Sequence, residues 1–268
     1  MNNASDYKLY KNCWVATNPK QTERLSEADA CAMLDGGGIL VRNTYDWDCN
    51  VSSFWYVIKD TYGGLEELSS KVRNQVRKSL RTYDVRKVSG DEMFADCFDL
   101  FNYSRERFQD KKLLISREQW RKRCGTKGAE FWVAYDKETH LPQAFAINYL
   151  HDTFCDYSSM GVNPRAPKSS YPMYGLIQEM NRYYLEELKL QYVCDGARSI
   201  TEHSNIQPFL EDKFKFRKAY CQLQIFYKPW FGLAIKILFP FRKWVKNKKV
   251  AAILRQEAWA KECYKKNT

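Results

Sequence analysis

The sequence predicts a mixed α/β fold, of the α+β kind, with a largely antiparallel central sheet flanked by helices and a C-terminal basic amphipathic helical tail. Segments rich in β-branched and aromatic residues predict successive strands at 130–135, 143–150 and 153–162. Only His151 and Asp152 separate the last two, so a tight hairpin makes this region an antiparallel meander. Apolar residues recur at helical spacing in 65–81 and 172–188, which predicts the two principal helices.

The remaining elements follow from shorter signals along the chain. Ser26 before Glu27 is an N-cap signal, and Ser116 with Gln119 occupies capping-box positions, so a helix should begin after each serine. The glycines at 36–38 form a turn and not a phosphate-binding loop, because the Lys-Ser/Thr pair of that motif is absent. Further strands are expected at 7–16, 39–41, 54–58, 84–88, 191–194 and 218–227. Further helices are expected at 25–34, 91–108, 116–124 and 201–214.

Length and cysteine usage limit the class of protein. With 268 residues the chain is long enough for one large domain or two small ones. The nine cysteines are scattered and include no C-x-x-C pair, so neither a zinc cluster nor another metal is expected. Met1–Pro19 contains no charged segment followed by an apolar one, so no secretory signal peptide is expected there. These features favour a reducing cytoplasm and free, mostly buried thiols.

Positive charge is concentrated at the C-terminal end. The net charge is +11, and residues 228–268 contain eleven Lys and Arg against two Glu, a net of +9. Residues 1–227 therefore carry 32 basic and 30 acidic residues, a net of +2. Because a nucleic-acid-binding body would present a basic face, nucleic acid is not expected as a partner of this body. RNA binding through the tail alone stays open.

The segment 229–268 joins an apolar, aromatic stretch to this positive charge. Residues 231–241 are apolar apart from Lys236, and they are fewer than the roughly 20 that a bilayer span needs. The basic residues that follow directly are Arg242, Lys243, Lys246, Lys248 and Lys249. This arrangement predicts a peripheral anchor on an anionic membrane surface, at the inner face of the membrane. The alternative is a helix that packs on the body and leaves its lysines in water.

The stretch 153–189 reads as a strand, a basic loop with several prolines, and a long amphipathic helix. Pro172 marks the start of the helix, with Ser169 or Ser170 as its N-cap. A strand that leads through a loop to a helix N-terminus presents free N–H groups and a positive dipole end, which suits an anion such as phosphate. The alternative is an ordinary strand–turn–helix connection.

The helix expected at 65–81 has a basic side. Arg73, Arg77 and Arg81 recur at four-residue spacing, with Asn74 and Lys78 beside them. Like charges at this spacing repel by a few tenths of a kcal/mol per pair, so the row is expected to contact an anionic substrate. A solvated face answered by acidic neighbours is the alternative. The apolar stripe that should face the core is Leu65, Leu68, Val72, Val76 and Leu80.

Segments between residues 54 and 228 resemble the acyl-CoA N-acyltransferase (GNAT) fold, in particular its Fem-type branch. That branch contains the aminoacyltransferases that build peptidoglycan cross-bridges, and acyltransferases of bacterial glycan gene clusters are related to it. Lys71–Leu80 resembles the basic Arg-x-x-x-Arg-Lys helix of the Fem-type proteins, and Tyr171–Tyr183 resembles their helix after the loop. Tyr192–Gly196 resembles their Asp-Gly strand end. Phe209–Lys218 resembles the closing Phe-Lys-x-Gly-Phe, with Lys215 where glycine is common.

The resemblance implies a GNAT-like domain at 1–228, with 1–90 as a candidate degenerate half-repeat, followed by the tail at 229–268. It implies acetyl-CoA or another acyl-CoA as the donor. Its binding residues would be Gly161, Val162, Arg165, Lys168, Ser169, Ser170 and Tyr174, with Arg73, Asn74, Arg77, Lys78 and Tyr171 toward the substrate. The family's loop is Gln/Arg-x-x-Gly-x-Gly/Ala, but Arg165–Tyr171 has no glycine. Either side chains hold the phosphates or the donor is not CoA.

The reaction that the resemblance implies needs a base for the amine proton and an acid for the leaving thiolate. Asp195, at a strand end before Gly196, is the first candidate for the base, and capping of the turn is its alternative role. His203 is a second candidate base, since its ordinary pKa lies near neutrality, or else a surface residue. Asp156 would lie near the same strand ends. Tyr220, like Tyr171 and Tyr174, could serve as an acid or as aromatic packing.

The expected function is therefore an N-acyltransferase that moves an acyl group from acyl-CoA to an amine, with an amino sugar or a cell-envelope glycan precursor as the acceptor. One alternative is a non-catalytic, membrane-associated module that binds a phosphorylated glycan or lipid precursor. Another is an aminoacyl-tRNA-dependent Fem-type transferase, although a body of net +2 suits that donor poorly.

Overall fold

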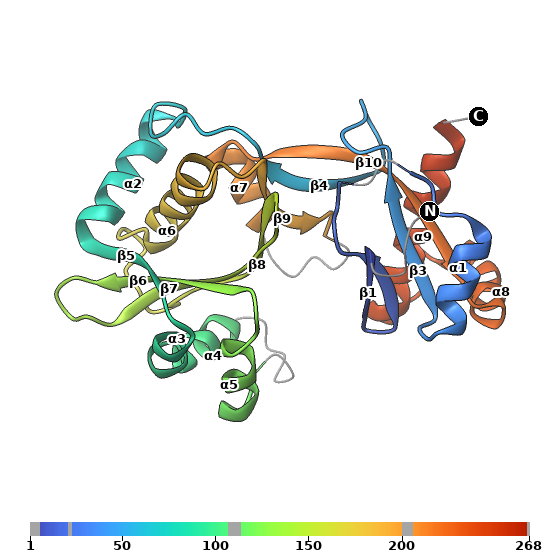
Figure 1. The fold of residues 1–268 in the computed structure, drawn as a ribbon, viewed down its shortest axis with the longest axis horizontal. Coiled ribbons are helices and arrows are strands. Elements are labelled where there is room, and N and C mark those ends of the chain that lie inside the picture. Colours follow the sequence, from blue (N-terminus) through green and yellow to red (C-terminus); the bar gives the residue numbers. More distant parts are fainter. Residues whose placement is uncertain (1–5, 21–22, 107–113, 200–205, 267–268) are drawn as a thin grey trace. The chain divides into compact units, whose positions relative to one another are not determined.

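A computed structural model describes residues 6–20, 23–106, 114–199 and 206–266 (Figure 1). The chain divides into two compact units, and each is described by itself. Unit 1 comprises Met1–Tyr56, Ala197–Glu202 and Lys218–Thr268. Unit 2 comprises Val57–Gly196 and His203–Arg217.

The sheet of unit 2 is mostly antiparallel. Its strands, in spatial order, are β9 (Tyr192–Ala197), β8 (Phe154–Val162), β7 (Pro142–Leu150), β6 (Ala129–Asp136) and β5 (Tyr83–Val88). The neighbours from β8 to β5 are antiparallel, whereas β8 and β9 are parallel. The predicted meander is confirmed, and so is the predicted mixed α/β fold with helices flanking the sheet.

Helices cover both faces of this sheet (Figure 1). One face carries α6 (Pro172–Asn181), with α2 (Ser70–Thr82) packed beside it and a π-helical turn, Arg182–Glu187, directly after it. The other face carries α3 (Gly90–Asp96), α4 (Phe98–Glu106) and α5 (Arg117–Cys124). The last helix of the unit is α7 (Ile206–Phe214).

Two helix predictions in unit 2 need correction. The single helix expected at 91–108 is two helices, because Cys97 leaves helical geometry at φ −109° and ψ 5° and ends α3. The helix expected at 65–81 begins only at Ser70, because the hydroxyl of Ser69 accepts the amide of Val72 and caps it there. The capping box of Ser116 and Gln119 is confirmed.

The loop before α6 also differs from expectation. Its N-cap is Tyr171, in the left-handed conformation at φ 57°, and neither Ser169 nor Ser170. Ser170 is not the cap because its hydroxyl and its amide both donate to the carbonyl of Pro167, at 2.6 and 2.9 Å. Pro172 is the first helical residue, as predicted.

The turn predicted at Asp195-Gly196 is wrong, since both residues lie within β9. Gly196 has a φ of 86°, which glycine adopts without strain, and its amide donates to the sulfur of Cys194 at 3.2 Å. The strand can therefore continue to Ala197, and the amide of Arg198 then donates to the carbonyl of Trp55 at 2.7 Å.

Unit 1 contains a second set of strands. In spatial order they are β1 (Tyr7–Tyr10), β2 (Cys13–Ala16), β3 (Leu40–Tyr45), β10 (Arg217–Tyr227) and β4 (Phe54–Lys59). Arg217 and the last three residues of β4 belong to unit 2. The single strand expected at 7–16 is a hairpin, because Lys11 and Asn12 take φ values of 48° and 63° and reverse the chain. The N-cap Ser26 of α1 (Glu27–Asp35) is confirmed, with its hydroxyl 3.1 Å from the amide of Asp29.

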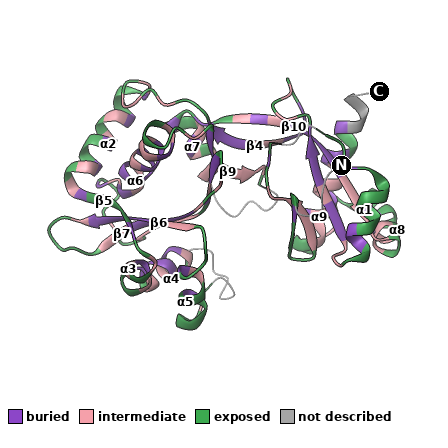
Figure 2. Cartoon of the chain, viewed as in Figure 1, coloured by how far each residue is buried: buried purple, intermediate pink, exposed green. Residues whose placement is uncertain are grey.

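The C-terminal segment consists of α8 (Pro229–Leu238), a 3₁₀ turn at Phe239–Phe241 and α9 (Lys248–Lys266). Helix α9 packs into unit 1, where Trp259, Ala260 and Cys263 share a core with Phe54, Cys221 and Leu223. The hydroxyl of Ser53 also donates to the carbonyl of Trp259 at 2.7 Å. Helix α8 is far more exposed than α9 (Figure 2).

Candidate functional site

The candidate site of unit 2 lies where two parallel strands part. The register of β8 with β9 runs from Phe154 opposite Tyr192 to Asp156 opposite Cys194. In the described chain β8 then continues to Val162 paired with β7 alone. Asp156 and Asp195 therefore stand at the point of divergence, one on each strand, at the last register pair and directly after it.

A β-bulge lies directly beyond this point. Ile147 of β7 is opposite Ser159, but its neighbour Asn148 is opposite Tyr157, so Ser158 is the extra residue of β8. Ser158 is exposed. The extra residue of a bulge keeps no ladder partner, and such bulges are over-represented next to active sites. Nothing in the sequence marks Ser158, because a bulge leaves the strand composition unchanged.

The surroundings of Asp195 disfavour the ionised form of its carboxyl group. Burial raises its pKa well above the ordinary value, and the nearby charge of Asp156 raises it further. A hydrogen bond from Gln207 acts in the opposite direction. Gln207 is in α7, and its side chain also donates to the backbone carbonyl of Asp195 at 3.4 Å. The sequence alone gives Gln207 no role. Its position at the start of α7 is the only feature of the sequence that could have indicated this contact.

The groups around the two aspartates are protonated and packed. Burial raises the pKa of the Tyr157 hydroxyl and of the Cys155 and Cys194 thiols well above their ordinary values. Tyr157 donates to the side-chain oxygen of Asn181 at 3.0 Å. At neutral pH these groups therefore supply neither a thiolate nor a phenolate.

The basic loop that the sequence assigned to the donor is partly occupied by its own contacts. The guanidinium of Arg165 lies 4.7 Å from the ring centre of Tyr103. Lys168 and Ser169 are exposed, whereas the hydroxyl of Ser170 is bonded within the loop. A Cβ at position 161 would collide with the Phe145 ring, so only glycine can pack against that ring here. Val162, next to it, is half-buried.

The start of α6 offers few free backbone donors to an anion. Pro172 has no N–H, the amide of Tyr174 donates to the carbonyl of Tyr171 at 2.9 Å, and the amide of Gly175 donates to the hydroxyl of Ser79 at 3.1 Å. The Tyr174 ring packs against Phe209, with centroids 5.2 Å apart. An anion at this end must therefore be held mainly by side chains.

Helix α2 presents such side chains beside α6. A cavity of about 500 Å³ is lined by Asn74, Arg77, Leu80 and Arg81. Lys78 lies 6.0 Å from the ring centre of Tyr171, the N-cap of α6. In contrast, Arg73 pairs with Glu66 at 2.8 Å and donates to the carbonyl of Leu68 at 3.2 Å. The arginine helix thus lies near this loop, but Arg73 is already partnered.

Two predicted catalytic residues are not described with this site. Tyr220 belongs to unit 1, where its ring meets Trp55 edge-on at 5.8 Å, so it is described with that unit. His203 lies outside the described residues.

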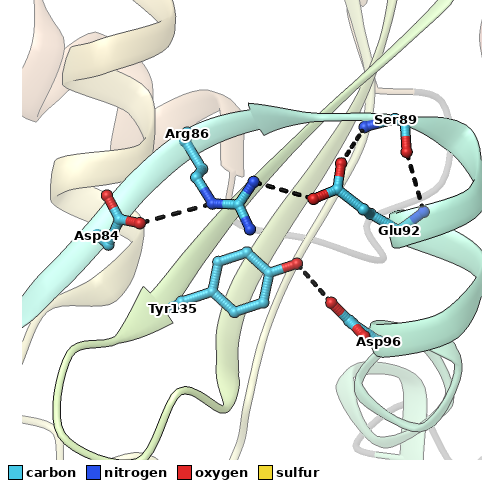
Figure 3. A network of polar contacts seen from close by, with 6 residues as sticks. All are labelled: Asp84, Arg86, Ser89, Glu92, Asp96 and Tyr135. Carbon is cyan, nitrogen blue, oxygen red and sulfur yellow. Dashed lines mark hydrogen bonds and ion pairs between the residues drawn. The ribbon is translucent and has the colours of Figure 1, made fainter.

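A second polar cluster in unit 2 is self-contained (Figure 3). It lines a cavity of about 300 Å³ that also includes His140. Arg86 pairs with Glu92 at 3.0 Å and with Asp84 at 3.5 Å, and the hydroxyl of Tyr135 donates to Asp96 at 2.8 Å. Because these charged groups bond to one another across β5, β6 and α3, the cluster serves to join those elements.

The described residues contain no group of three or more His, Cys, Asp and Glu arranged to hold a metal ion. All nine cysteines are free, and six of them are buried, as predicted. No helix in the described part of the chain is long and apolar enough to cross a bilayer.

Comparison with known proteins supports the fold. No protein-family model matches the chain, and no curated protein sequence matches it. FemX is similar in structure at a TM-score of 0.52 and 12% identity, over 69% of this chain and 65% of FemX. L-PGS from Bacillus licheniformis gives a TM-score of 0.52 at 11% identity, over 95% of this chain and 85% of that one. A GCN5-related N-acetyltransferase-like protein from Streptococcus suis gives a TM-score of 0.40 at 10% identity, over 81% and 79%.

These identities show the fold alone. The chain shares the fold of FemX and L-PGS, which confirms the Fem-type fold resemblance of the sequence prediction. It spans just under two thirds of the length of FemX.

Proposed function

We propose that this protein is a Fem-type, GNAT-like transferase that moves an acyl group to an amine. The observation that carries the proposal is the pair of carboxyl groups, Asp156 and Asp195, at the divergence of β8 and β9. The pKa of Asp195 is raised by burial and by the charge of Asp156, which is how catalytic carboxyl pairs acquire separate acid and base roles.

The pair suits the proton transfers of aminolysis. An amine attacks an acyl carbonyl only after it has lost its extra proton, and the leaving group must gain one. Asp195, whose pKa is raised, and Asp156 on the adjoining strand would exchange protons with the amine and the leaving group. A carboxylate there would also attract the ammonium form of the acceptor. The exposed bulge at Ser158 would supply the unpaired amide that stabilises the carbonyl oxyanion.

The donor is proposed to be an acyl-CoA, bound along β8 and the loop before α6. Because the start of α6 has few free amides, the phosphates of the donor would be held by Arg165, Lys168 and Ser169. The basic surface of α2, with Arg77, Lys78 and Arg81, would hold a second anionic group, such as a phosphate of an amino-sugar or cell-envelope glycan precursor. An aminoacyl-tRNA remains the alternative donor on the same site.

Donor binding and turnover test the proposal separately. Calorimetry with acetyl-CoA and longer acyl-CoAs measures the first, and release of free CoA in the presence of amino-sugar acceptors measures the second. We expect Asp195→Asn and Asp156→Asn each to lower kcat about a hundred-fold or more, with unchanged donor affinity. Asp152→Asn, an exposed aspartate just before β8, is the matched control and should keep full turnover.

Three outcomes would contradict the proposal. Normal turnover in both site variants would remove the catalytic pair. Binding of nucleotide sugars or lipid phosphates without any binding of millimolar acyl-CoA would favour a non-catalytic module. Transfer from an aminoacyl-tRNA without transfer from acyl-CoA would replace the donor and keep the site.

A further inference from the structure

Helix α8 carries two apolar faces. Phe231, Ile235 and Phe239, spaced by four residues, face unit 1: Ile235 is 3% exposed, and the ring centre of Phe239 lies 3.7 Å from the ammonium of Lys261 in α9. The only polar side chain of α8 is Lys236. A helix that is apolar nearly all round is stable when both faces are covered, so its outward face needs a partner.

The outward face is a continuous row of large apolar side chains, spaced by three or four residues through α8 and the turns after it. We call this row the apolar ridge. It consists of Trp230 (63% exposed), Leu233 (61%), Ile237 (60%), Phe241 (51%) and Trp244 (76%). Single exposed apolar residues are ordinary on a protein surface, but a continuous patch marks an interaction site.

Positive charge surrounds this ridge. Residues 228–249 contain seven Lys and Arg and no Asp or Glu. Lys236 lies within α8, and Arg242, Lys243 and Lys246 follow it, all exposed. Tryptophan at the polar–apolar boundary and lysine next to it are the residues that settle at the level of lipid headgroups. Each basic residue near an anionic leaflet contributes about 1 kcal/mol of attraction.

We propose that the apolar ridge of α8 inserts into an anionic lipid bilayer and lies in its interfacial plane. The ten residues of α8 span only about 15 Å, so the helix can lie at the surface but cannot cross the hydrocarbon core. Helix α9 is not part of this anchor, because its Trp259, Ala260 and Cys263 are buried in the core of unit 1. The anchor is therefore α8 with residues 239–246, a smaller element than the tail 229–268.

A second copy of the chain is a less suitable occupant of the same face. A symmetric dimer would place the same surface against itself, and with it two sets of seven positive charges without one acidic residue. Anionic lipid headgroups neutralise these charges, whereas a second copy would repel them. This proposal does not depend on the transfer reaction.

Co-sedimentation with lipid vesicles tests the proposal. The intact chain is mixed with vesicles of phosphatidylcholine containing phosphatidylglycerol, and with vesicles of phosphatidylcholine alone. We expect partitioning at least ten times stronger with the anionic vesicles. The variant Leu233→Ser, Ile237→Ser, Phe241→Ser should reduce that partitioning more than ten-fold. The variant Lys243→Glu, Lys246→Glu should abolish the preference for anionic lipid.

The control must remove equally exposed apolar side chains elsewhere. Val51→Ser, Leu141→Ser, Leu188→Ser does so, at sites that are 61%, 59% and 40% exposed, and should bind vesicles as the wild type does. Thermal unfolding midpoints check that every variant is folded.

Any of three results would overturn the proposal. The wild type could remain in the supernatant with anionic vesicles. The apolar variant could bind as well as the wild type, which would show attraction by charge alone. Light scattering could show a wild-type dimer that the apolar variant dissociates, without vesicle binding, which would make a second copy the occupant.

Discussion

The backbone amide of Gly175 in α6 donates a hydrogen bond to the side-chain hydroxyl of Ser79 in α2, at 3.1 Å. This bond joins the two segments that the sequence marked as the basic helix and the helix after the donor loop. Because the Gly175 amide is used in this bond, it is not available to bind a ligand at the start of α6. The helices approach so closely here because position 175 has no side chain and position 79 has a small, fully buried one.

The first prediction concerns this contact. A Cβ added at Gly175 would lie 2.6 Å from the Ser79 hydroxyl and 3.2 Å from its Cβ. Gly175→Ala should therefore lower the free energy of unfolding by about 1–3 kcal/mol, as expected for overpacking of a close interface. Chemical denaturation measures it.

A matched variant separates the collision from other causes. The double variant Gly175→Ala, Ser79→Gly removes the colliding side chain and should recover part of the lost stability. A double variant less stable than the sum of the two single changes would contradict the steric explanation.

The second prediction concerns a buried ion pair in unit 2. The ammonium of Lys59, 1% exposed, lies 2.7 Å from the carboxylate of Glu67. No well-aligned hydrogen bond from this ammonium accompanies the pair among the described residues. Glu67→Gln leaves a buried charge without its counter-charge and should destabilise the protein by about 3 kcal/mol.

Glu66→Gln is the control for this prediction. Glu66 also pairs with a basic residue, Arg73 at 2.8 Å, but its side chain is 74% exposed. Exposed pairs contribute roughly 0–1 kcal/mol, so the change should be small. Equal losses in the two variants would show that burial does not determine the contribution of these pairs.

The third prediction separates α9 from α8. Trp259, 6% exposed, fills the unit 1 core beside Phe54 at a ring distance of 6.1 Å. Trp259→Ala should cost about 3–5 kcal/mol of unfolding free energy. Trp244→Ala, at a position 76% exposed, should change stability by about 0.5 kcal/mol or less. Similar losses at both positions would mean that α8 and its turn are packed as tightly as α9.

Periodicity and capping signals were sufficient for most of the fold. The meander at 130–162, the cap at Ser26 and the capping box at Ser116 depend on residues near in sequence, so the sequence predicts them. Errors arose where a local conformation overrides composition. The hairpin needs positive φ at Lys11 and Asn12, and the break at Cys97 interrupts an unbroken helical pattern.

The site was only partly predictable for a related reason. The sequence predicted Asp195 as a catalytic candidate from its place near a strand end, and Asp156 from its place in the strand expected at 153–162. Their proximity depends on the parallel register of β8 and β9, which joins residues far apart in the chain. The bulge at Ser158 and the bond from Gln207 are set by the same tertiary pairing. No pattern in one sequence specifies that register.

The last prediction is a pH dependence of stability that Asp195 imposes. In the unfolded chain this carboxyl ionises near its ordinary pKa of about 3.9. In the folded protein burial and the Asp156 charge raise that pKa well above 3.8, so the folded state binds more protons over the interval between the two values. Stability must then fall as pH rises through that interval, by at most about 1.4 kcal/mol per pH unit, and level off above the folded pKa.

Asp195→Asn removes this penalty because the amide never ionises. We expect the variant to be more stable than the wild type at pH 7 and the difference to vanish toward pH 4, while turnover is lost. Denaturant unfolding of both proteins from pH 4 to pH 8 measures the difference, and Asp152→Asn shows what an exposed substitution does by itself. A variant less stable than the wild type at pH 7, or a difference independent of pH, would mean that folding does not raise the pKa of the Asp195 carboxyl. A stabilising substitution that removes activity is the behaviour expected of a residue kept for chemistry at a cost in stability.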